Sequence, residues 1–135
     1  MANEHVLVYE TSLPLAFICA DGTGIEKGAV LKLADPNTVS AAAALNDVVG
    51  GVCAEEKVAS DGKTKVPVYR AGVFKATASG SITAGDPLII SGPTANNLLQ
   101  TAGVNSENVF GYSRETCTDG ETFLYELKPT TMQLA

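Results

Sequence analysis

The residues that could carry out catalysis in this 135-residue chain are few and scattered. The only histidine is His5, near an N-terminus that we expect to be mobile and to lack the orienting partner and pocket of a catalytic histidine. Ser12, Ser60 and Ser113 lie outside any G-x-S-x-G motif, and Cys117 has no second histidine to act as its base. The sequence therefore predicts that the protein is not an enzyme.

Motifs that would bind a cofactor or a metal are also lacking. The segment Asp21-Gly22-Thr23-Gly24 is superficially like a phosphate-binding loop, but no Lys-Ser/Thr pair follows it, so we interpret it as a turn. The three cysteines, Cys19, Cys53 and Cys117, are odd in number and show no C-x-x-C spacing, which argues against a disulfide framework or a zinc site. We expect them to fill the core of a protein made in a reducing compartment, with no cofactor and no metal.

Charge and hydropathy argue against nucleic acid and membrane as partners. Nine Lys and Arg residues stand against 15 Asp and Glu, a net charge of -6, which leaves no basic footprint for phosphate backbones or anionic membranes. The longest apolar run, Leu13 to Ala20, has eight residues and contains Pro14, whereas a transmembrane helix needs about 20. The segment before it carries Glu4 and Glu10 and no Lys or Arg, which is unlike a signal peptide. Only 18% of residues are charged, a surface that suits an assembly.

The hydrophobic pattern has a period of two rather than 3.6 residues and indicates strands. Alternation is clear in the segments 66–69, 74–79 and 123–127, and Gly or Pro recurs every eight to twelve residues. This spacing leaves little room for long helices and predicts a compact all-β domain. The one helix candidate is Ser40 to Val49, where a short helical turn is the less favoured alternative.

Three sequence blocks recur in the same order. The pattern I-x-x-G-x-x-L-x-[LI] occurs at 25–33 and 82–90, a Gly-initiated block at 51–55 and 111–115, and an Asp-Gly block at 61–66 and 119–124, with offsets of 57, 60 and 58. We interpret them as a pseudo-repeat with units of about 25–68 and 82–127. The predicted organisation is an N-terminal arm, 1–12, followed by a single β domain, 13–135.

Two segments have features of an interaction surface. Residues 6–11 alternate like a strand without a turn to a neighbour, so the arm either adds to the sheet of another chain or pairs within its own domain. The segment Val68 to Phe74 combines aromatic residues with Arg70, a mixture favoured at protein interfaces. A strand with one salt-bridged arginine explains that segment equally well.

The order and spacing of several runs resemble a known family. These runs are Leu13 to Gly28, Leu31-Lys32-Leu33, Gly50-Gly51-Val52, Val66 to Phe74 and Gly80 to Asp86. They are similar to the head decoration (cement) proteins of tailed double-stranded DNA viruses, such as the lambdoid head decoration protein. The resemblance is strongest from Leu13 to Pro87 and continues more loosely to Leu127.

The resemblance implies a β-clip-like or β-tulip-like domain that forms homotrimers on the exterior of the expanded capsid, at three-fold and quasi-three-fold positions, and stabilises the shell. It implies the major capsid protein as partner and a protein made in the host cytoplasm and located in the virion. The arm that contacts the capsid would then comprise Asn3, Glu4, His5, Val6, Leu7, Val8 and Tyr9, and the trimer interface is expected at Tyr69, Arg70, Val73 and Phe74. The alternative is a β-clip-like ligand- or carbohydrate-binding module, whose polar face would include Thr77, Ser79, Ser81 and Thr83.

Overall fold

The computed structural model describes residues 3–92, 97–103 and 108–131, and these ranges form strands, turns and loops without a helix. The strands are β1 (Val6–Tyr9), β2 (Leu15–Ile18), β3 (Val30–Ala34), β4 (Thr38–Ala41), β5 (Val49–Cys53), β6 (Lys65–Tyr69), β7 (Gly72–Thr77), β8 (Pro87–Ile90), β9 (Leu99–Thr101), β10 (Asn108–Ser113) and β11 (Thr122–Thr131). The all-β prediction is confirmed. The helix candidate is wrong, because β4 ends at Ala41 and the chain turns before β5.

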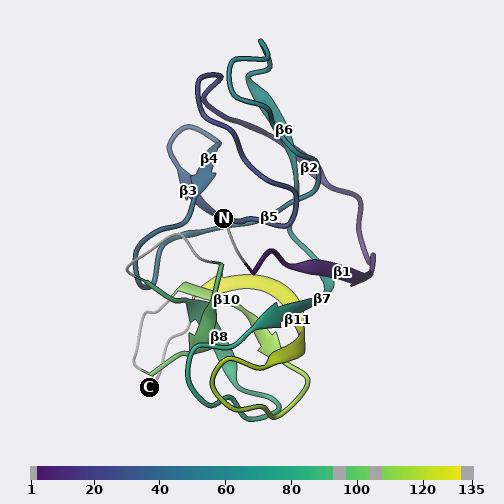
Figure 1. Cartoon of the computed structure of the whole chain (residues 1–135), viewed down its shortest axis with the longest axis vertical. Helices are drawn as coiled ribbons and strands as arrows, with labels where there is room; N and C mark the ends of the chain where they lie inside the picture. The colour runs from purple at the N-terminus through teal and green to yellow at the C-terminus, as the bar shows by residue number, and fades with distance from the viewer. Residues whose placement is uncertain (1–2, 93–96, 104–107, 132–135) are drawn as a thin grey trace.

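The strand order repeats along the chain. Strands β2 to β6, the first unit, are arranged as β2-β6-β5-β3-β4, and strands β7 to β11, the second unit, as β7-β11-β10-β8-β9. Each antiparallel pairing in the first unit, such as β2 with β6 or β3 with β4, has its counterpart in the second, β7 with β11 or β8 with β9. The two units therefore share one topology, and Figure 1 shows the first above the second.

Two glycines occupy matching places in the units and show how closely the backbones are packed. A Cβ atom on Gly51 would overlap the carbonyl oxygen of Tyr69, and a Cβ atom on Gly111 would overlap the carbonyl oxygen of Glu126. Gly51 also has a φ of 137°, which other residues rarely adopt. Gly51 and Gly111 are 60 positions apart, and their contact residues Tyr69 and Glu126 are 57 positions apart. The same steric requirement therefore recurs at the offsets of the sequence repeat.

The units differ at the edge where each barrel closes. In the first unit, β2 pairs with β4 in parallel through Ile18 and Thr38 and completes a closed five-stranded barrel. In the second unit the corresponding contact is a single parallel bridge between Ala78 and Leu99. Here β1 adds to β7 and becomes the outer strand of a six-stranded sheet. Figure 1 shows β1 where the two units meet, a position we call the seam.

Two hydrophobic clusters form the core. The smaller one fills the first barrel with Phe17, Cys19, Ile25, Ala29, Leu31, Val39, Cys53, Val66 and Val68. The larger one contains most of the buried aromatic side chains, namely Phe74, Phe110, Phe123 and Tyr125. It also takes in Val30, Ala42, Val49 and Val52 of the first unit. Because this cluster crosses the seam, burial of its apolar surface holds the two units together.

Candidate functional site

The N-terminal arm lies on its own domain. Its strand pairs antiparallel with β7, with Val6 opposite Lys75 and Leu7 opposite Phe74, and a bulge shifts the register before Tyr9. Of the two alternatives left open by the alternation in residues 6–11, the structure shows pairing within the chain. Asn3 and Glu4 precede the strand, and Leu7 packs against the larger cluster. Because β1 is the terminal strand of its sheet, its other edge has no partner strand in the described chain.

His5 fastens the arm at the seam. Its backbone N–H donates to the carbonyl of Gly28 in the first unit at 2.8 Å. Its ring makes two hydrogen bonds to the second unit. Nε2 donates to the carbonyl of Asn97 at 2.8 Å, and Nδ1 accepts from the Tyr125 hydroxyl at 2.6 Å. Asn97 in turn accepts a hydrogen bond from the N–H of Val30 through Oδ1. The expectation of a mobile terminus is therefore wrong at His5, which is 4% exposed.

The environment of His5 keeps its ring neutral. Burial lowers the pKa of His5 to about 4, and the hydrogen bond to Asn97 offsets only part of this effect. No carboxylate contributes to the shift. A neutral ring suits one donated and one accepted hydrogen bond, as observed. His5 therefore has a structural role, because its hydrogen bonds hold the arm against both units.

Apolar side chains from the arm to the start of β2 point into solvent. We call this set the N-terminal apolar strip; it comprises Val6, Val8, Tyr9, Leu13 and Leu15, with relative exposures between 42% and 75%. Five large apolar side chains exposed within ten consecutive residues are more than the scattered exposure normal for a soluble surface. Together with the open edge of β1, they form the candidate contact surface of the molecule.

The predicted trimer-interface residues fall into two groups. Val73 and Phe74 belong to β7 and are buried in the chain's own core, where the Phe74 ring stacks on Tyr125. Their apolar character is thereby explained without a partner. Tyr69 and Arg70 are half-buried at the end of β6 and just beyond it, and the Tyr69 hydroxyl donates to Glu10 at 2.9 Å. Only these two remain available to a neighbouring molecule, and the interface itself stays a prediction.

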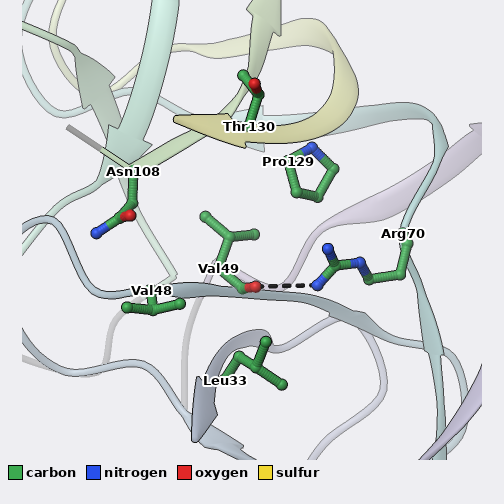
Figure 2. Close-up of a pocket in the computed structure, with 7 residues that line it drawn as sticks. All are labelled: Leu33, Val48, Val49, Arg70, Asn108, Pro129 and Thr130. Carbon is green, nitrogen blue, oxygen red and sulfur yellow. Dashed lines mark hydrogen bonds between the residues drawn. The ribbon is translucent and has the colours of Figure 1, made fainter. Parts of the chain in front are cut away.

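Arg70 lines a pocket at the seam (Figure 2). Its Nη1 donates to the carbonyls of Val49 and Gly50, each at 3.1 Å. The pocket has a volume of about 170 Å³ and is lined from the first unit by Leu33, Val48, Val49 and Arg70 and from the second by Asn108, Pro129 and Thr130. Burial lowers the pKa of Arg70, and no neighbouring carboxylate counters this effect. The alternative of a salt-bridged arginine finds no partner among the described residues.

A buried lysine, Lys57, lies in the loop between β5 and β6 and was not found by sequence reasoning. Lys57 is 2% exposed, and its Nζ contacts the carboxylates of Asp21 at 3.1 Å and Asp61 at 2.6 Å. It also donates to the carbonyls of Asp21 and Val58. The hydrogen bond from Lys57 is the main reason that the pKa of Asp61 falls to about 2. The carboxylates of the Asp21-Gly22 and Asp61-Gly62 turns thus hold a buried cation.

The remaining candidate chemistry is not assembled into a site. Cys19, Cys53 and Cys117 are free and buried, and burial raises the pKa of Cys53 to about 11, which makes its thiol unreactive. Among the described residues, no group of three or more His, Cys, Asp or Glu side chains is placed to hold a metal ion. The described part of the chain also has no helix that is long and apolar enough to span a bilayer.

The polar residues of the alternative binding face lie along one stretch of the second unit. Thr77 ends β7, and Ser79, Ser81 and Thr83 follow on the loop before β8. Ser81 and Thr83 are exposed, and the backbone N–H of Thr83 donates to Asp86 within the same turn. A hollow near the arm, lined by Glu4, His5, Val6, Leu7, Lys27, Ala54 and Tyr69, and the Arg70 pocket are both formed by other residues. Neither hollow therefore draws on this polar stretch.

The fold is similar to that of a solved phage protein. No protein-family model matches the sequence, and no curated protein matches it. Among solved structures, the N base of the head fiber gp8.5 of bacteriophage phi29 is similar with a TM-score of 0.56 at 21% sequence identity. The match covers 90% of this chain and 98% of that chain. The likeness therefore extends over both units and shows a shared fold.

Proposed function

We propose that this protein is a structural component of a bacteriophage virion that binds the exterior of the expanded capsid as a homotrimer, at three-fold and quasi-three-fold positions, and stabilises the shell. Its partner is the major capsid protein, and it is made in the host cytoplasm. It acts by binding, without catalysis.

One observation carries this proposal, namely the fold shared with the base of a bacteriophage head fiber over nearly the whole of both chains. Fold alone does not determine function. The second support is the resemblance to head decoration proteins in the order of the sequence runs between Leu13 and Pro87. The contact surface is the third support, because an apolar strip beside an open strand edge is typical of a surface that docks on another protein.

The arm would bind the capsid without leaving its own domain. His5 fastens it at the seam and β7 pairs with its inner edge, so its outer edge offers free backbone N–H and C=O groups to a strand of the capsid protein. Val6 and Val8 would then bury their side chains against the shell. An arm already held in the bound conformation loses less conformational entropy on docking than a disordered one.

Stabilisation of the shell follows from mass action. A ligand that binds only the expanded shell lowers its free energy relative to states that do not bind. A trimer presents three arms, and simultaneous engagement raises the net affinity by roughly a hundredfold or more where the geometry permits it. Many copies of a modest contact are therefore sufficient to resist the outward pressure of packaged DNA.

Co-sedimentation with expanded, undecorated capsids tests the proposal. The wild-type protein should pellet with the capsids and raise the temperature at which they break. The double variant Val6→Asp/Val8→Asp should lose most of this binding, because it places two charges on the docking edge while both positions are solvent-exposed in the free protein. Circular dichroism should show that this variant is folded.

The matched control is Val58→Asp, which changes an apolar side chain of nearly the same exposure outside the arm. This variant should bind capsids as the wild type does. Failure of the wild-type protein to pellet with expanded capsids would refute the proposed function. Equal binding by the arm variant and the control would refute the role of the arm.

A further inference from the structure

Arg70 is a half-buried cation whose hydrogen-bonding capacity is largely unused. A guanidinium group has five N–H donors. In Arg70 only Nη1 is engaged, by the carbonyls of Val49 and Gly50, and neither Nε nor Nη2 has an acceptor among the described residues. Figure 2 shows the guanidinium beside Val49, with one nitrogen on the dashed bond to the Val49 carbonyl and the other nitrogen atoms farther from that carbonyl. The free edge formed by Nε and Nη2 is the one that binds a carboxylate through two parallel hydrogen bonds.

The contrast with the other charged side chains makes this arrangement informative. Lys57, more deeply buried, has two carboxylates, and Arg114 pairs with Glu126 at 3.3 Å even though both are exposed. Arg70 is partly desolvated and has no carboxylate. Desolvating a cation costs free energy unless an anion compensates for it. The positive charge of Arg70 is therefore not compensated by any carboxylate of the described residues, and an anionic group from outside them would complete this arrangement.

The pocket limits what that group can be. Its volume of about 170 Å³ is well below the roughly 300–1,000 Å³ of typical small-molecule sites. It suits a single side chain better than a sugar acid. The lining by Leu33, Val48 and Pro129 favours the methylene stem of an acidic side chain, while Arg70 binds its carboxylate.

We propose that the Arg70 pocket receives an Asp or Glu side chain from a second copy of this chain and that this ion pair is part of the interface between subunits. The inference rests on the homotrimer of the proposed function. The chain has 15 acidic and nine basic residues, so a second copy supplies carboxylates in excess of the cations available to pair with them. Both units line the pocket, so an inserted side chain would also hold the seam together.

Sedimentation equilibrium of the purified protein tests this inference, with the oligomer dissociation constant as the readout. The variant Arg70→Leu should raise that constant by about thirtyfold or more, because removing one partner of a desolvated ion pair leaves the other charge buried and unpaired. Arg70→Lys should give a smaller increase, because it keeps the charge but loses the two-pronged geometry. Arg114→Leu is the matched control and should leave the dissociation constant unchanged, as its ion pair is solvent-exposed.

A wild-type protein that stays monomeric up to several hundred micromolar would overturn the inference, as would an oligomer that Arg70→Leu and Arg70→Lys leave intact. Circular dichroism and thermal unfolding verify that each variant is folded. If Arg70→Leu does not fold, Arg70→Lys still tests the inference. Capsid co-sedimentation separates this inference from the proposed function. A monomer that binds capsids contradicts the Arg70 inference and the homotrimer but leaves the capsid role intact, whereas an Arg70-dependent oligomer that does not bind capsids contradicts only the capsid role.

Discussion

The two units of this protein have the same strand order but are stabilised in different ways. Where β5 of the first unit leads into its turn, Ile25 bridges Lys57, whose buried ammonium group is held by two carboxylates. At the same place in the second unit, Ile82 bridges Cys117, which is apolar and needs no partner. The same backbone bridge thus carries a charged side chain, Lys57, in the first unit and an apolar one, Cys117, in the second.

The aromatic side chains show the same division. The first barrel contains one phenylalanine, Phe17, together with small and aliphatic residues. The second unit buries Phe74, Phe110, Phe123 and Tyr125 against one another. The arm lies on this aromatic unit, and its histidine is in contact with Phe110 and Tyr125. The second unit therefore supplies the aromatic contacts of the arm, and the first unit contributes the carbonyl of Gly28.

The largest expected effect is the loss of a buried aromatic side chain from either core cluster. Phe123→Ala should lower the free energy of unfolding by about 4–5 kcal/mol, and Phe17→Ala by about 3 kcal/mol, because Phe123 lies in the larger aromatic cluster. Urea unfolding followed by circular dichroism measures both, as the chain has no tryptophan. A larger loss for Phe17→Ala would contradict the larger contribution expected from the aromatic cluster of the second unit.

The next effect tests the equivalence of the units. Gly51→Ala and Gly111→Ala should each cost about 3 kcal/mol, because the added methyl group would overlap a carbonyl oxygen of the adjacent strand. Gly22→Ala is the control and should change stability by less than about 0.5 kcal/mol, since open space surrounds its Cβ position. Tolerance of alanine at one site but not at the other would show that the close approach of the strands is not shared.

A smaller effect concerns the arm and pH. The pKa of His5 is lowered to about 4 in the folded protein and is about 6.5 in the unfolded chain, so the unfolded chain binds more protons between these values. Stability should therefore fall as the pH drops from 7 to 5, by about 2 kcal/mol. Urea unfolding at both pH values measures the loss, and hydrogen exchange at Leu7 should show release of the arm.

His5→Gln is the matched variant for this prediction. Glutamine at this position retains a donor but does not titrate, so the variant should lose most of the pH dependence between 7 and 5. An equal loss of stability in the variant and the wild type would mean that other groups cause the effect.

The smallest effect is the acid response of the first unit. The pKa of Asp61 is lowered to about 2 by its hydrogen bond to Lys57, so the stability that the pair contributes is complete above about pH 4. It should disappear as the pH falls through 2. In Asp61→Asn this part of the decline in thermal midpoint should be absent, whereas Asp119→Asn, at the matching turn beside Cys117, should decline as the wild type does. A wild-type-like decline in Asp61→Asn would contradict the role of the ion pair.

Much of the fold was predictable because its determinants are local. Apolar alternation marked β6, β7 and β11, and the spacing of Gly28 and Gly85 before their strands marked a repeat, although the predicted units began at 25 and 82 and so left out β2 and β7. Such patterns depend on residues that are neighbours in the sequence. The arm was recognised as a strand for the same reason, although its partner β7 was not.

The side-chain interactions that shape the candidate site were not predictable. His5 is buried because Tyr125 lies opposite it, 120 positions along the chain, and Lys57 finds Asp21 at a distance of 36 positions. A pattern of neighbouring residues does not predict contacts between side chains that lie so far apart in the sequence. Phe74 was expected at an interface because aromatic residues are common there, but alternation does not say which face of a strand is covered by the chain itself.

Cryo-electron microscopy of expanded, undecorated capsids incubated with this protein tests the proposed virion role most directly. We expect trimeric density on the outer surface at three-fold and quasi-three-fold positions, with β1 against a strand of the major capsid protein and an acidic side chain of a neighbouring copy in the Arg70 pocket. Capsids that remain bare at saturating protein concentration would contradict the proposed function.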